Sequence, residues 1–239
     1  MSEWAAKRFW AEAAAGEEAG AHVVRLDGRP IRTPSRALLA LPTQALAAAV
    51  AEEWNRQEEI ILPATMPMTR LANTAQDRVA PEFDAVARMV AAYGETDLLC
   101  YRADGPPELV RRQREAWDPL LDWAAEHFGA RLHPTVGVVP VAQPGTALDR
   151  LAAAVKDRSA WRLTALHELV VLTGSLVAGL AVAEGAYAPD EAWTVSRIDE
   201  DWQSAQWGSD SEAEASAARR RAGFLEAVRF DRLLAGAVP

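Results

Sequence analysis

Cysteine is nearly absent from this chain of 239 residues, in which Cys100 is the only one. A single cysteine cannot form an intrachain disulfide, and it cannot supply the several thiolates that many structural zinc sites use. Long apolar runs are missing too: the longest, residues 169–183, has 15 residues, whereas a membrane-spanning helix needs about 20. We therefore expect no disulfide, no metal site and no insertion into a membrane.

Basic residues are also scarce relative to acidic ones, 25 against 34, and the net charge is −9. Such a chain repels polyphosphate, so we expect no nucleic-acid partner. The basic run Arg219-Arg220-Arg221 follows an acidic stretch and is expected to pair internally. The first residues lack an apolar signal-peptide core and carry several glutamates, which is not typical of a transit peptide. We expect a cytoplasmic protein if the source is bacterial, and a mitochondrial matrix protein if the chain is a trimmed eukaryotic one.

Familiar catalytic motifs are missing as well. The sequence has no P-loop, no Rossmann glycine fingerprint and no nucleophile elbow. His167-Glu168 begins like a zinc-protease helix, but residue 171 is valine where the second histidine ligand would stand. We therefore expect no catalytic residue and no cofactor. The alternative is a small-molecule hydrolase that uses the Asp97–Cys100 or the Asp199–Asp201 region. Such an enzyme would need a concave pocket that contains an ionisable group with a strongly shifted pKa.

Hydrophobic periodicity and turn residues predict an α+β fold with two domains. A small β-rich amino-terminal domain is expected over residues 1–63, and a larger, mainly α-helical domain over residues 64–239. A β-hairpin is expected over residues 22–33, because Asp27-Gly28 tolerates the positive φ angles of a type I′ turn. Helices are expected over about residues 42–57, 68–79, 81–93, 107–128, 146–156, 159–185, 189–207 and 209–234.

Shorter segments give weaker patterns. Residues 38–41 and 59–62 are interpreted as short strands, residues 134–144 as an extended segment, and residues 97–101 as either a strand or a helical turn. Pro119 is expected to kink or break the helix that contains it, and Gly129 to end it. Ser209 and Glu212 have the spacing of a capping box for the last helix.

Tryptophan is the residue in excess: there are nine, against three tyrosines and five phenylalanines. Most tryptophans of such a chain fill the core between helices, and some can instead anchor a protein–protein surface, where Trp and Arg are enriched. The tryptophans interpreted as packing residues are Trp4, Trp117, Trp123, Trp161 and Trp193.

Segments along most of the chain resemble one known family. They are Arg8-Phe9-Trp10, residues 26–34, Glu53-Trp54 with Gln57, Met66-Pro67, residues 69–75, Asp77-Arg78, residues 95–102, Gln113, residues 117–120, Glu200 with Trp202-Gln203, and Trp207-Gly208. In this order they are similar to the assembly chaperones for the α subunit of F-type ATP synthase, the Atp-twelve chaperones, over about residues 8–215. The family often has another aromatic residue at the position of Trp202, a departure that keeps the ring.

The resemblance implies a two-domain chaperone, expected to be a monomer, that holds the unassembled α subunit and prevents its aggregation until β subunits take over that interface. Nucleotide hydrolysis is not implied. The candidate partner-binding residues are Glu200, Asp201, Trp202, Trp207, Trp54, Arg70 and Asp97. The helix face over residues 200–207 is the expected client-binding surface, and the other three are expected mainly to brace the two domains. An interaction module with a different client is the remaining alternative.

Overall fold

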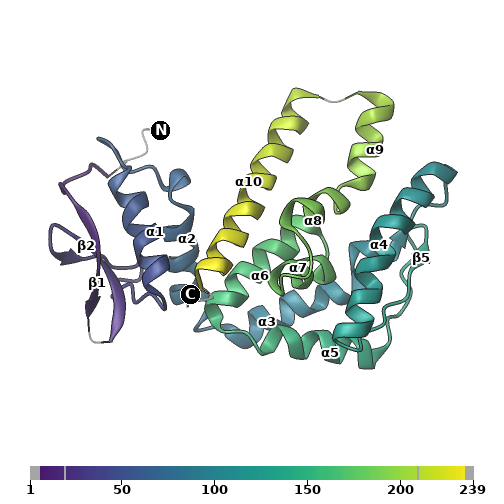
Figure 1. The fold of residues 1–239 in the computed structure, drawn as a ribbon, viewed down its shortest axis with the longest axis horizontal. Helices are drawn as coiled ribbons and strands as arrows, with labels where there is room; N and C mark the ends of the chain where they lie inside the picture. Colours follow the sequence, from purple (N-terminus) through teal and green to yellow (C-terminus); the bar gives the residue numbers. More distant parts are fainter. Residues whose placement is uncertain (1–5, 19, 209, 235–239) are drawn as a thin grey trace. The chain divides into compact units, whose positions relative to one another are not determined.

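The computed structural model describes residues 6–18, 20–208 and 210–234. These residues form several helices and two small sheets, which confirms the predicted α+β class (Figure 1). The strands are β1 (Ala13–Glu18), β2 (Ala21–Leu26), β3 (Arg29–Pro30), β4 (Tyr101–Arg102) and β5 (Thr135–Val136). The α-helices are α1 (Gln44–Asn55), α2 (Pro67–Thr74), α3 (Phe83–Ala92), α4 (Pro107–His127), α5 (Gly145–Lys156), α6 (Ala160–Thr173), α7 (Leu176–Ala183), α8 (Pro189–Val195), α9 (Ile198–Trp207) and α10 (Ser211–Leu234).

The chain divides into two compact units, neither of which is continuous in sequence. Among the described residues, the first unit takes the chain up to Phe83, Ala160–Ala165 and the chain from Arg229 onward; the second takes Asp84–Ser159 and Leu166–Val228. The boundary predicted after residue 63 differs from this division. Residues 64–83 lie in the first unit because α2 packs against α1, and the ends of α6 and α10 join the core of the same unit.

The first unit is built on a three-stranded antiparallel sheet in the order β1-β2-β3. The predicted hairpin is present: Asp27 and Gly28 have φ angles of +47° and +83°, as a type I′ turn requires. Strand β1 was not expected, because its Ala-rich sequence has weak β propensity, but it pairs with β2 along its whole length. Helix α1 packs on β1 and β2 and buries its apolar face there. The segments expected as strands at residues 38–41 and 59–62 make only isolated bridges.

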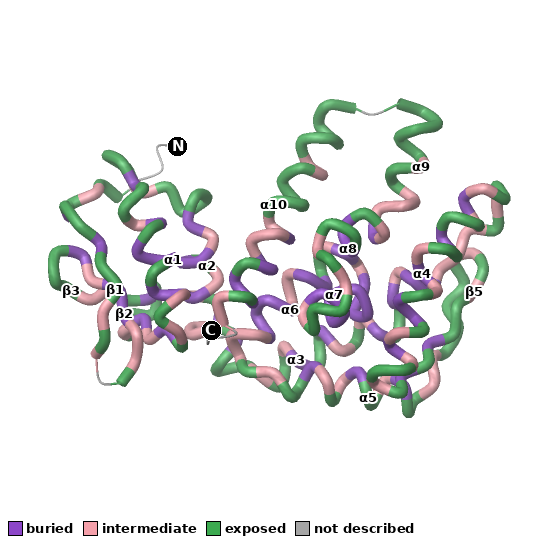
Figure 2. Tube along the Cα trace, viewed as in Figure 1, coloured by how far each residue is buried: buried purple, intermediate pink, exposed green. Residues whose placement is uncertain are grey.

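The second unit is mainly helical, and two of its expected helices are each divided. The helix expected over residues 159–185 ends at Thr173, because Gly174 takes a φ of +72° and Ser175 then caps α7. The helix expected over residues 189–207 is divided into α8 and α9. Figure 2 shows α7 as one of the buried segments of this unit, in keeping with its apolar sequence.

The ends and interruptions of other helices were partly predicted. Helix α4 continues through Pro119, so the proline does not break it, and Gly129 follows its end with a φ of +65°. The segment at residues 97–101, interpreted as either a strand or a helical turn, contains both. A 3₁₀ turn at Leu98–Cys100 leads into strand β4. Ser209, the expected cap of α10, lies outside the described residues; the Glu212 N–H donates to the Asp210 carboxylate at 2.8 Å.

A buried carboxylate in each unit binds the start of a helix. In the first unit, Glu53 of α1 accepts hydrogen bonds from the backbone N–H groups of Met68 at 2.6 Å and Thr69 at 2.8 Å, in the first turn of α2. In the second unit, Asp97 accepts one from Val177 at 3.0 Å, in the first turn of α7. The first N–H groups of a helix have no partner within the helix, and a negative charge there is favoured by the helix dipole.

Replacing Glu53 with glutamine tests how much the first of these contacts stabilises the chain. Glutamine keeps one oxygen, but its NH₂ group must face a backbone donor, so we expect the free energy of unfolding to fall by about 1–3 kcal/mol. The matched control is Glu58→Gln, an exposed position in the same unit, which should change it by less than about 0.5 kcal/mol. Urea unfolding followed by circular dichroism measures both; equal stabilities for the two variants would contradict the assignment.

Candidate functional site

Helix α9 carries four of the seven candidate residues, and its first half is held against α4. The Gln113 side-chain amide donates to the Asp199 carboxylate at 2.6 Å, and Gln113 also accepts a hydrogen bond from the Ala103 N–H at 2.8 Å. The guanidinium of Arg112 lies 5.2 Å from the centre of the Trp202 ring, within cation–π distance. Trp202 is therefore half-buried and fixed in orientation by α4, not free at the surface.

The remaining candidates on α9 point to solvent. Glu200 and Asp201 are exposed, and each makes one ion pair with Arg197, at 3.9 Å and 3.4 Å. Trp207, at the end of the helix, is 86% exposed, an unusual state for a large aromatic side chain. Three successive acidic residues span too wide an arc to lie on one face, and in the fold Asp199 turns toward α4 while the next two turn outward. Helix α9 thus presents two carboxylates, of Glu200 and Asp201, and one indole, of Trp207, to solvent.

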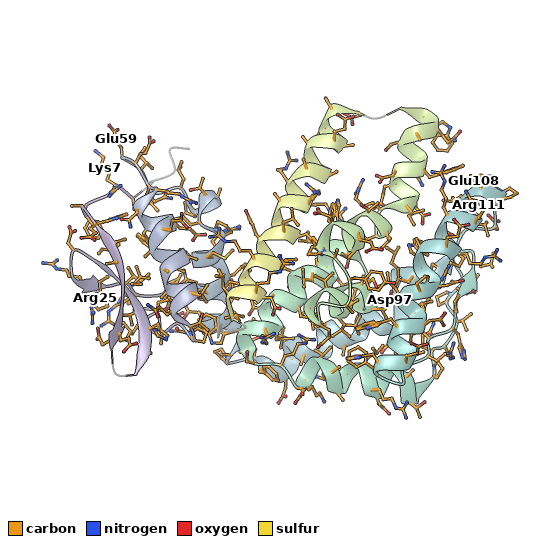
Figure 3. All side chains as sticks on the ribbon, viewed as in Figure 1. Lys7, Arg25, Glu59, Asp97, Glu108 and Arg111 are labelled. Carbon is orange, nitrogen blue, oxygen red and sulfur yellow. The ribbon has the colours of Figure 1, made fainter. Side chains whose placement is uncertain are left out.

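Asp97 occupies a different environment, since it is fully buried in the second unit (Figure 3). Its two oxygens accept hydrogen bonds from the backbone of Leu99 and of Val177, each at 3.0 Å. Burial raises the pKa of this carboxyl, and the hydrogen bonds from Val177, Ser175 and Leu99 act in the opposite direction. With no exposed surface, Asp97 contributes to a partner site only through the elements that it joins, the turn before β4 and α7.

The neighbouring Cys100 is equally inaccessible, with 1% of its surface exposed. Burial, and then the nearby Asp97 carboxylate, raise the pKa of the thiol to about 12, so at neutral pH it is protonated. The thiolate is the nucleophilic form of cysteine, and reactive cysteines lie in accessible, electropositive surroundings. The geometry of this region therefore does not favour the hydrolase alternative at Asp97–Cys100.

Trp54 and Arg70 lie together in the first unit, where both line a cavity of about 640 Å³. Trp54 comes from the end of α1, and its ring packs on Trp10 at a centroid distance of 5.1 Å. Arg70 comes from α2 and is exposed. One side of the cavity is held by the loop at Pro34-Ser35, since the Ser35 N–H donates to the Asp77 carboxylate at 2.9 Å. The structure thus brings together two candidates separated by 16 positions in the sequence.

Other residues of this cavity were not among the candidates. Met66, Asn73, Thr74 and Arg78 also line it, from α2 and the segments on either side of it. All four lie in the segments that resemble the chaperone family, so that similarity was the available signal. Helical periodicity alone could not identify them, because part of the cavity lining comes from a loop distant in sequence, at Pro34-Ser35.

The tryptophans interpreted as packing residues differ in burial. Trp117 and Trp193 are buried, Trp123 and Trp161 are half-buried, and Trp4 lies outside the described residues. The basic run at residues 219–221 pairs internally in part: Arg220 donates to the Leu172 carbonyl at 2.9 Å, and Arg221 pairs with Asp190 at 2.6 Å. 

Membrane-spanning helices and metal-binding clusters are both absent from the described part of the chain. No helix there is sufficiently long and apolar to cross a bilayer. Among the same residues, no group of three or more His, Cys, Asp or Glu side chains is placed to hold a metal ion.

Comparisons with known proteins agree with each other. The family model described as ATP12 chaperone protein matches residues 7–125. The crystal structure of Atp12 from Paracoccus denitrificans is 52% identical, with a TM-score of 0.93, and the match covers 97% of this chain and 100% of that one. A crystal structure from Agrobacterium tumefaciens is 39% identical, with a TM-score of 0.92, over 95% of this chain and 86% of that one. The mitochondrial protein atp12 of Schizosaccharomyces pombe is 25% identical over 224 residues, which are 87% of this chain and 75% of that protein.

The state of Cys100 can be measured by its reaction with a disulfide reagent. A pKa of about 12 leaves roughly one thiol in 10⁴ ionised at pH 8, and burial limits access further. We expect native protein to react at least about a hundredfold more slowly than protein unfolded in guanidinium, with the native rate rising as the pH is raised. Absorbance after addition of Ellman's reagent measures both rates. Rapid reaction of the native chain would restore Cys100 as a candidate nucleophile.

Proposed function

This chain belongs to the ATP12 chaperone family, and from that premise we propose that its client is the unassembled α subunit of F-type ATP synthase. The family places the chain in ATP synthase assembly. In our proposal it acts by binding, not by catalysis: it holds the α subunit and prevents its aggregation until β subunits take over the same interface. We further propose that it works as a monomer, in the bacterial cytoplasm or, for a trimmed eukaryotic chain, in the mitochondrial matrix.

The observation that carries the proposal is the exposed face of α9. An α subunit alone leaves uncovered the apolar surface that it normally presents to β, and uncovered surfaces of this kind aggregate. Trp207, 86% exposed, offers a large apolar contact at the end of α9. Indole side chains are enriched among the residues that carry most of the binding energy at protein interfaces. Glu200 and Asp201, exposed on the same helix, supply the charged rim around it.

The fixed first half of α9 suits this role. Trp202 and Asp199 are held by Arg112 and Gln113 of α4, so the helix is ordered before any partner arrives. An ordered surface loses little conformational entropy on binding. Few exposed side chains on α9 can anchor a client. The affinity is therefore expected to be moderate, which permits transfer of the client to the β subunit.

Purified proteins test the proposed client directly. We expect this chain to be retained by unassembled α subunit and to suppress its light scattering on warming, in the absence of ATP. Unassembled β subunit serves as the control for client choice, and it should not be retained. Aggregation of the α subunit at an undiminished rate in the presence of excess chain would contradict the proposal.

Glu200→Lys tests the surface on α9. Glu200 is exposed and its ion pair with Arg197 is long, at 3.9 Å, so we expect the free energy of unfolding to change by less than about 0.5 kcal/mol. Rescue of ATP synthase assembly in cells that lack the chaperone should nevertheless be lost, because the variant reverses a charge in the proposed contact face.

The matched control for that variant is Glu126→Lys, which makes the same charge change at an exposed position of α4 in the same unit. It should rescue assembly as the unchanged chain does. Full rescue by a stably folded Glu200→Lys protein would remove α9 from the client-binding surface.

A further inference from the structure

The cavity in the first unit is lined by two chemically different kinds of side chain, apolar and cationic. Trp54, Ile61 and Met66 line it with apolar surface, and Pro34 and Pro63 add rigid apolar edges. Its volume of about 640 Å³ falls within the range of about 300–1,000 Å³ that is usual for pockets that bind discrete groups. Because these side chains come from four separate segments that are packed together, the pocket exists before anything binds to it.

The lining of the cavity also includes cationic side chains. Arg70 and Arg78 both line the cavity and are exposed. Asp77, which also lines the cavity, accepts a hydrogen bond from the Ser35 N–H at 2.9 Å. In a chain with a net charge of −9, two guanidinium groups at one apolar pocket select for a carboxylate.

Two polar atoms in the walls have no hydrogen-bond partner among the described residues. They are the indole N–H of Trp54, a donor, and the side-chain oxygen of Asn73, an acceptor, and both are buried. Buried polar groups in proteins nearly always have partners. A peptide unit offers one acceptor and one donor, so an extended segment can satisfy both atoms after a small rotation of these side chains.

Apolar surface continues outside the pocket. Leu62 and Ile60, on the segment that supplies Ile61, are 54% and 45% exposed. This segment is held in place by backbone hydrogen bonds with the first described residues: Ile61 N–H donates to Ala6 at 2.9 Å (Figure 3 labels the neighbouring Lys7 and Glu59). A ligand that contacts both the pocket and this rim must extend beyond the pocket, as a peptide segment with apolar side chains does.

We infer that this pocket binds an extended segment of the client in which an aromatic or aliphatic side chain stands next to an aspartate or glutamate. The apolar side chain enters between Trp54 and Met66, and the carboxylate pairs with Arg70 and Arg78. The inference rests on the proposed function, since the segment is assigned to the ATP synthase α subunit. The pocket adds a cation-lined anchor to the acidic contact face on α9.

Photo-crosslinking tests the segment. The photoreactive residue p-benzoylphenylalanine is placed at Leu62, on the rim, and in a matched protein at Met89, which is similarly exposed at 55% but lies in the second unit. After irradiation with purified α subunit, we expect the label at position 62 to crosslink to one α-subunit peptide that contains an apolar residue beside Asp or Glu. The label at position 89 should not reach that peptide, and mass spectrometry identifies the products.

Charge reversal at the pocket tests the recognised group. Arg78→Glu, at an exposed position where the side chain makes no ion pair within the described residues, should reduce the crosslinking yield from position 62 roughly fivefold. Arg88→Glu, an exposed position on α3, is the control and should leave the yield unchanged. Filling the cavity with Thr74→Phe should also reduce the yield, without any change in charge.

The outcomes separate this inference from the proposed function. If the chain retains α subunit but position 62 crosslinks nowhere on it, or only to segments without a carboxylate, the pocket does not have this role while the client assignment stands. Yields that are equal for Arg78→Glu and Arg88→Glu would likewise overturn it. If the unchanged chain retains no α subunit, both the client and the pocket assignments fail.

Discussion

A buried carboxylate bound to the start of a helix is the contact on which each unit depends. Glu53 accepts three hydrogen bonds, from two backbone N–H groups at the start of α2 and from the Thr69 hydroxyl at 2.7 Å, and it is only 3% exposed. A carboxylate at that depth without partners would be strongly destabilising, and so would the unpaired N–H groups of the helix. Each satisfies the other, so α1 and α2 are fixed together in one arrangement.

That arrangement positions the surfaces assigned to binding. Helix α2 carries Arg70 and Asn73 toward the cavity, and α1 carries Trp54 immediately after Glu53. In the second unit, Asp97 binds α7, α4 packs against α7, and α4 holds the start of α9 through Gln113. In each unit, a buried acidic residue that is not itself accessible to a partner protein determines where the exposed residues lie.

The two proposed contact surfaces differ in charge. Helix α9 presents carboxylates beside an exposed indole, whereas the cavity of the first unit presents guanidinium groups beside apolar side chains. Charges of opposite sign on two surfaces discriminate against wrong clients more than they add affinity. Such discrimination suits the role proposed above, in which the chain holds one unassembled subunit and later releases it to another subunit.

The sequence by itself determined what depends on local chemistry and on similarity. The Asp27-Gly28 turn and the glycine after α4 follow from conformational preference. The order of similar segments indicated the family. Only the tertiary structure decided the division of the segment at residues 189–207 into two helices, the pairing of the Ala-rich β1, and the cavity around Trp54. These depend on contacts between segments far apart in the chain, and a periodic pattern within one segment carries no information about which distant segment will pack against it.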